Sequence, residues 1–250
     1  MLLWVQLLVG LYVALAIVAS VVSVGQLYRR QRPDAIFQFR STLAYACQLL
    51  LRAFAAARFI LVVVAQPLLY EYATWSFGLQ GIYFVSATIY QVAHHWSRYE
   101  PVLFHRDSYV LNTLLDMSCA SVLPALLAFA TSTSVLDGQN LALHGASFLV
   151  YLLEFVGNHF VVQRQSLGLT LLLPTAYVIL LCVHQESTPS TWLDLSSPEA
   201  AAGYACLFLS HVVAFGLFYM LSLLKERYLH GQCPIVVNQG PPKARKLSFV

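Results

Sequence analysis

The sequence predicts an all-α protein, a polytopic transmembrane helix bundle of about six to seven spans. Of its 250 residues, 59% are hydrophobic and only 10% are charged, and the mean hydropathy is +0.68. Soluble domains carry roughly 25% charged residues, so this composition excludes a soluble globular class. The apolar residues also gather into separate runs of span length, and the loops between these runs alternate in charge.

Seven apolar runs are long enough, at about 20 residues each, to cross a bilayer as helices. They cover residues of about 2 to 24, 43 to 67, 72 to 91, 108 to 131, 141 to 161, 167 to 185 and 199 to 224. The first run lacks the positively charged start of a signal peptide, which predicts a retained helix rather than a cleaved leader. The chain thus divides into an extra N-terminal helix with a basic loop (1–40), a bundle (41–228) and a basic, weakly ordered tail (229–250).

Positive charge alternates from loop to loop. The stretches YRRQRPD, HHWSRYEPVLFHRD, QRQ and KERYLHG, after the first, third, fifth and seventh runs, carry Arg or Lys, whereas QPLLYE, STSVLDGQ and HQESTPSTWLDLSSPE carry neither. Because positively charged loops stay in the cytoplasm, we expect the N-terminus outside and the C-terminus inside. The net charge of +3 is small and comes mostly from these loops, which argues against a nucleic-acid partner.

Three polar residues from distant runs are predicted to meet near the outer surface. Thr74 follows the start of the third run, His144 follows the start of the fifth, and His184 ends the sixth. The alternating helix directions bring all three to one leaflet. Each also has a structural interpretation, because an intramembrane Thr bonds to a carbonyl one turn back and a lone His bridges helices.

Glu154 is the most expensive residue to place inside the bundle. It follows His144 by ten residues, so it lies about 15 Å deeper and on a neighbouring helical face. A carboxylate at that depth needs a partner. We expect an interhelical partner, either Arg58 or a hydroxyl such as that of Tyr177, whereas Arg52 extends its charge to the interface.

Other polar residues have plainer interpretations. Asn140 shares a face with His144 at i,i+4 and occupies the expected N-cap of the fifth helix. Asn112 and Asp116, one turn apart, predict a polar stripe against another helix. The five cysteines form no C-x-x-C pair, so we expect free thiols and neither a disulfide framework nor a metal site.

The pattern N-x(3)-H-x(9)-E-x(4)-H, formed by Asn140, His144, Glu154 and His159, resembles the androgen-induced (FAR-17a-like) family of multi-pass membrane proteins. The stretch RAFAAARFILVVVAQPLLYEYATWSFGLQGIYF is similar to the related rolling-stone branch, in which an Arg-bearing helix precedes a helix start rich in Tyr, Thr and Trp. The resemblance covers residues 48–224, and the first helix falls outside it.

This resemblance implies a membrane hydrolase that cleaves fatty acid esters of hydroxy fatty acids, with Thr74 as nucleophile and His144 as base. Asn140 and His184 are then candidate donors to the oxyanion, and Glu154, His159 and Tyr177 complete the expected polar surroundings. We expect no cofactor. The expected partners are membrane lipids and a lipid-ester substrate, in the endoplasmic reticulum, the plasma membrane or an organellar inner membrane.

Two other functions stay open. A non-catalytic accessory subunit of a larger membrane complex would use the N-terminal helix and the tail to dock partner subunits. A transporter would carry broken helices at matched positions, but Pro124 and Pro174 are isolated and no repeat accompanies them.

Overall fold

The computed structural model describes residues 3–29, 42–65, 71–96, 105–132, 138–158, 160–183, 194–195 and 197–232, with only the backbone described near several helix ends. These residues form eight α-helices and one short 3-10 turn, and they contain no β-strand. The predicted all-α class is therefore confirmed. Each of the seven predicted apolar runs is helical over most of its length.

The helices follow one another along the chain with short connections. They are α1 (Leu3–Arg29), α2 (Thr42–Ala65), α3 (Tyr72–Trp96), α4 (His105–Ser132), α5 (Gly138–Gly157), the 3-10 turn η1 (Arg164–Ser166), α6 (Leu167–Thr170), α7 (Leu172–Val183) and α8 (Ala200–Gln232).

The sixth predicted run is broken into α6 and α7 at Leu171. Pro174 explains the break, because it has no N–H to donate to the carbonyl of Thr170, four residues before it. The Leu171 N–H instead bonds back to the Gly168 carbonyl at 3.2 Å, which tightens the last turn of α6. Helix α7 then begins at Leu172.

Four segments of the described chain are long and apolar enough to cross a membrane: Leu3–Leu27, Leu43–Val64, Arg164–Val183 and Ala200–Lys225. Shorter apolar helices cover Val110–Leu126 and Gly145–Gly157. These segments fit an integral membrane protein, whereas the count of six to seven spans stays a prediction. The outer faces agree, because Leu7, Leu61 and Met220 are 66%, 67% and 62% exposed, as expected of side chains that contact lipid.

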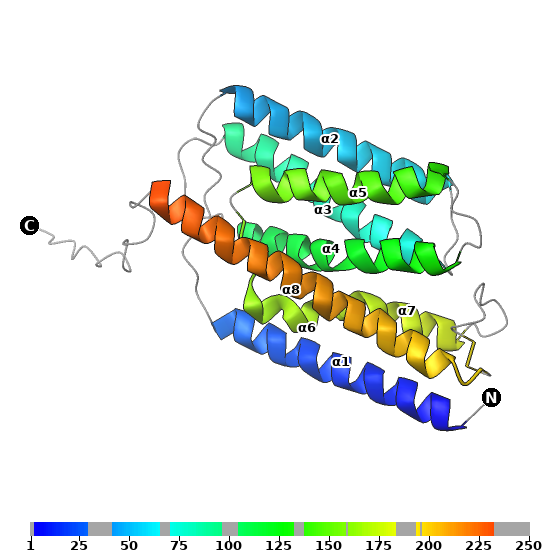
Figure 1. The fold of residues 1–250 in the computed structure, drawn as a ribbon. Helices are drawn as coiled ribbons and strands as arrows, with labels where there is room; N and C mark the ends of the chain where they lie inside the picture. Colours follow the sequence, from blue (N-terminus) through cyan, green and yellow to red (C-terminus); the bar gives the residue numbers. More distant parts are fainter. Residues whose placement is uncertain are drawn as a thin grey trace, which may run out of the picture.

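The helices lie side by side along their length (Figure 1), and their directions alternate. Helices α1, α3, α5 and α8 begin at the end of the bundle marked by the N-terminus, which we call the N-terminal end. Helices α2, α4 and α6 begin at the opposite end. The starts of α3 and α5 therefore share one end of the bundle, as the loop charges predict.

Two apolar clusters fill the interior. The first surrounds Phe59 of α2, whose ring stacks on Phe77 and Phe84 of α3 with centroids 5.9 and 5.7 Å away. The second joins α1, α7 and α8 through residues such as Val9, Tyr177 and Tyr204.

Helix α1 packs closely against α6. The Ser20 hydroxyl donates to the Gly168 carbonyl at 2.7 Å, and the Gly168 N–H donates to the Ser23 hydroxyl at 2.9 Å. A Cβ on Gly168 would lie 2.1 Å from the backbone oxygen of Ala19. Only a glycine allows the two backbones to approach this closely.

Candidate functional site

The predicted site residues lie in two regions or outside the described chain. Thr74 is the third residue of α3 and is half-buried. Asn140 and His144 lie in the first two turns of α5, where only the backbone is described. The N-cap assignment of Asn140 is wrong, because α5 already begins at Gly138. His159 and His184 lie outside the described residues.

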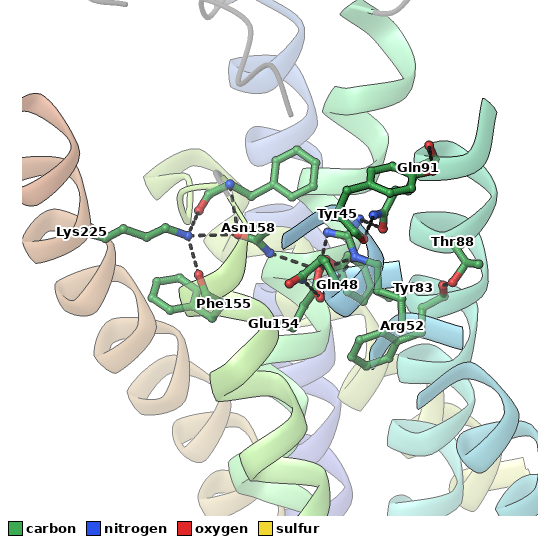
Figure 2. Close-up of polar contacts among 12 residues, drawn as sticks. Tyr45, Gln48, Arg52, Tyr83, Thr88, Gln91, Glu154, Phe155, Asn158 and Lys225 are labelled. Atoms are coloured by element: carbon green, nitrogen blue, oxygen red, sulfur yellow. Dashed lines mark hydrogen bonds and ion pairs between the residues drawn. The ribbon is translucent and has the colours of Figure 1, made fainter. Parts of the chain in front are cut away.

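Glu154 is the centre of a fully buried polar network that joins three helices (Figure 2). Its carboxylate accepts hydrogen bonds from Arg52 Nη2 at 2.7 Å and Nε at 2.9 Å. The Gln48 amide of α2 and the Tyr83 hydroxyl of α3 donate to it at 2.5 and 2.7 Å. The Asn158 amide adds a further bond at 3.3 Å. Donors from four side chains occupy the carboxylate oxygens, so Glu154 anchors helices rather than receiving a proton from a substrate.

Arg52 extends the network from α5 to α3. Its Nη1 donates to the Gln91 side-chain oxygen at 3.0 Å, and the Gln91 amide donates to the Tyr45 carbonyl at 3.0 Å. Both charged groups are 0% exposed. An ion pair in such a dry setting persists only when further hydrogen bonds satisfy both partners, and these side chains provide them.

The expected partner of Glu154 was wrong. Arg58 instead donates to the Ser147 hydroxyl at 3.2 Å and lies over the Phe59 ring, 5.4 Å from its centroid. Tyr177 belongs to the second apolar cluster and packs edge-on against Tyr72. Arg52, which was expected to reach the interface, is the buried partner because its side chain points back toward the start of α2, where α5 ends.

Lys225 of α8 ties the end of α5 to the network. Its ammonium donates to the carbonyl of Phe155, to the Asn158 side-chain oxygen at 3.0 Å and to the Phe160 carbonyl at 2.9 Å. It also lies 4.6 Å from the centroid of the Phe155 ring. A cation at this position satisfies carbonyls that a helix C-terminus leaves without partners and complements the helix dipole.

Replacing Lys225 by Met is expected to lower the free energy of unfolding by about 2 kcal/mol, because it strands three oxygen acceptors in a dry interior. Titration with sodium dodecyl sulfate measures the change. Arg227→Met is the matched control, since Arg227 is an exposed cation on the same helix. Equal stabilities of the two variants would show that the Lys225 contacts contribute nothing.

A second polar pair lies toward the N-terminal end of the bundle. The hydroxyl of Tyr72 bonds to Nε2 of His211, and His211 Nδ1 lies 2.8 Å from the Leu207 carbonyl. A carbonyl cannot donate, so Nδ1 carries the proton and Nε2 accepts from Tyr72. His211 is 0% exposed and joins α8 to the start of α3. Both of its nitrogens are occupied, so this pair positions helices.

Asn112 and Asp116 of α4 contact the segment between α5 and α6, which confirms the predicted polar stripe. The Asn112 amide donates to the Val161 carbonyl at 3.2 Å. Asp116 accepts from the Gln163 N–H at 3.1 Å and from the Ser166 hydroxyl. These bonds satisfy backbone and side-chain groups of a non-helical segment at the end of the bundle.

The cysteines of the described chain are free thiols: Cys119 is buried, Cys182 is half-buried, and Cys47 and Cys206 are exposed. Within the same residues, no group of three His, Cys, Asp or Glu side chains could hold a metal ion.

Several residues of the network were missed in the sequence: Gln48, Tyr83, Gln91, His211 and Lys225. A signal existed for two of the contacts. Gln48 and Arg52 are spaced i,i+4, as are Glu154 and Asn158, and this spacing places each pair on one helical face. The contributions of α3 and α8 leave no such local signal, because they depend on which helices become neighbours. No protein-family model, curated protein or solved structure matches this chain.

Proposed function

We propose that this protein is an intramembrane hydrolase of lipid esters, in which Thr74 is the nucleophile and His144 is the general base. The observation that carries the proposal is that helices α3 and α5, which hold these residues, meet the same side chain, Phe59 of α2, at equivalent positions.

The first contact comes from α3. A Cβ on Gly81 would lie 3.5 Å from the Cβ of Phe59, so this face of α3 is turned to Phe59. Thr74 precedes Gly81 by seven residues. Seven residues correspond to about two helical turns, which returns to nearly the same face about 10 Å along the axis.

The second contact comes from α5. The Tyr151 ring lies 6.4 Å from the Phe59 ring, and His144 precedes Tyr151 by the same seven residues. Since α3 and α5 run in the same direction (Figure 1), both candidates are displaced from Phe59 toward the N-terminal end by the same two turns. This register supports a meeting of the two residues beside the outer part of α2.

The Tyr83–Glu154 hydrogen bond supports an equal depth for the two candidates. It joins α3 to α5 at 2.7 Å. Thr74 lies nine residues before Tyr83, and His144 lies ten residues before Glu154, which corresponds to about 14 and 15 Å along the two axes. The buried network therefore acts as a positioning device for a site two to three turns away.

The proposed reaction has two steps. His144 takes the proton of the Thr74 hydroxyl as its oxygen attacks the ester carbonyl, and the alcohol leaves with that proton. Water then attacks the acyl-threonine, giving its proton to His144, and the carboxylic acid leaves as Thr74 regains a proton. No oxidant, reductant or metal enters this scheme.

A membrane lipid with an ester near the headgroup level is the proposed substrate class. The exposed apolar faces of α2 and α5, including Leu61 at 67% and Leu149 at 58% exposed, lie where lipid chains would contact the bundle. A substrate that approaches from the bilayer keeps its chains in an apolar medium throughout.

Thr74→Ala and His144→Ala are each expected to reduce turnover of lipid esters by on the order of 10³-fold or more, because the nucleophile and its base act as a unit. The purified protein in lipid nanodiscs is assayed with esters of hydroxy fatty acids and simple glycerol esters. Thr74→Ser should keep measurable turnover, since it retains the hydroxyl.

Thr88→Ala is the matched control for loss of a hydroxyl from α3, because the Thr88 hydroxyl bonds to the Phe84 carbonyl 2.7 Å away in the same helix. It should keep full activity. Unchanged turnover in folded Thr74→Ala rules out the proposed nucleophile, and absence of turnover in the parent protein with all esters favours the non-catalytic accessory role.

A further inference from the structure

Three fully buried polar atoms in the core between α3, α4 and α5 have no hydrogen-bond partner in the structure. They are the side-chain oxygen of Gln80 and the hydroxyls of Ser118 and Tyr151. All three side chains are 0% exposed. Buried polar groups in folded proteins are almost always satisfied, by protein atoms or by ordered water.

The three atoms belong to one connected polar cluster. Ser118 lies beside Tyr151, and its carbonyl accepts from the Ser121 hydroxyl at 2.9 Å. The Ser76 hydroxyl donates to the Ser121 hydroxyl at 3.0 Å and accepts from the Gln80 amide at 2.8 Å. One chain of hydrogen bonds thus runs from Gln80 through two serines to Ser118.

Helix α4 contributes a further acceptor to the same region. Pro124 lies inside α4 and has no N–H, so the carbonyl of Ala120, four residues earlier, loses its helical partner. Ala120 is 0% exposed. In membrane-spanning bundles such carbonyls are satisfied by neighbouring side chains or by water.

We propose that this cluster, which we call the core polar site, binds ordered water inside the bundle. Water has the required chemistry. It can donate to the Gln80 oxygen, which only accepts, and it can accept from the Tyr151 hydroxyl and exchange bonds with Ser118. An apolar ligand would leave all three atoms unsatisfied.

The location of the core polar site gives the water a role that rests on the proposed hydrolase function. Gln80 follows Thr74 by six residues and Tyr151 follows His144 by seven, so the site lies about two turns deeper than the proposed catalytic pair. It supplies the water that hydrolyses the acyl-threonine, in a bundle otherwise lined by apolar side chains.

Footprinting with hydroxyl radicals generated by X-rays tests the water site without any need for enzymatic activity. Radicals formed from bound internal water modify the side chains next to it. In the folded protein, Tyr151 should be modified several-fold faster than Tyr83, which is equally buried but donates to Glu154. The double variant Gln80→Leu, Ser118→Ala should bring Tyr151 down to the Tyr83 rate, with Tyr83 itself unchanged as evidence of folding. Equal rates for Tyr151 and Tyr83 in the parent protein overturn the proposal.

Pre-steady-state kinetics test the supply of water to the reaction. Tyr151→Phe should leave the burst of alcohol release intact and slow the following release of acid about tenfold. Unchanged acid release overturns the supply role, even where footprinting shows the water. Rapid labelling of Tyr151 in a protein without esterase activity refutes the proposed function and leaves the water site standing.

Discussion

Glu154→Leu lowers the free energy of unfolding by an expected 3 to 5 kcal/mol, on the order found when one partner of a buried ion pair is removed. The substitution strands the Arg52 guanidinium, which is 0% exposed, together with donors of Gln48 and Tyr83 that bond only to this carboxylate among the described contacts. The loss is large because these groups have no water to turn to. Detergent titration of the purified protein, followed by circular dichroism, measures it.

The double variant Arg52→Met, Glu154→Leu is the decisive control. Buried pairs are often replaceable together by apolar side chains with little loss, so it should be at least about 2 kcal/mol more stable than the sum of the single changes predicts. Additive losses would mean that the two groups do not interact as described. Because the network also sets the depth of α5 relative to α3, the double variant should fold but lose hydrolytic rate.

Gly168→Ala is expected to cost about 2 to 4 kcal/mol and to loosen α1 from the bundle. The added methyl group would lie 2.1 Å from the Ala19 oxygen and 2.3 Å from the Ser23 hydroxyl. A backbone atom cannot move aside as a flexible side chain can, so α1 and α6 must separate. The bonds of Gly168 with Ser20 and Ser23 are then lost as well.

Gly216→Ala provides the matched comparison for this change. Gly216 also lies within a helix, but a Cβ there meets no atom within 4 Å. Since Ala has the higher helix propensity, this variant should be as stable as the parent or slightly more stable. Thermal denaturation of the two variants in the same detergent separates them, and a similar effect from both would contradict the close α1–α6 packing.

The helices could be predicted because their signal is local. Each apolar run of about 20 residues identifies a helix without reference to any other, and the charge of the loops orders their directions. The break at Leu171 was also accessible, since Pro174 lies in the sixth run. It was missed because one proline can be accommodated near a helix start and its effect depends on the preceding turn.

The partner of Glu154 could not be predicted in the same way. Both Arg52 and Arg58 lie in α2, and the choice between them depends on how far α2 is shifted along α5. That shift is fixed by packing around Phe59, by the Tyr83 hydroxyl and by Lys225 from the far end of the chain. None of these contacts leaves a periodic signal in the sequence.

By itself, the sequence determined that this chain is an all-helical membrane protein whose segments alternate in direction, because hydrophobicity and loop charge act on each segment separately. Only the tertiary structure decided that Arg52 and Lys225 satisfy the end of α5, that Gly168 brings α1 against α6, and that Gln80, Ser118 and Tyr151 share one core. The physical reason is that a buried polar group must find its partner among whatever helices become its neighbours. Those neighbours are set by the packing of the whole bundle.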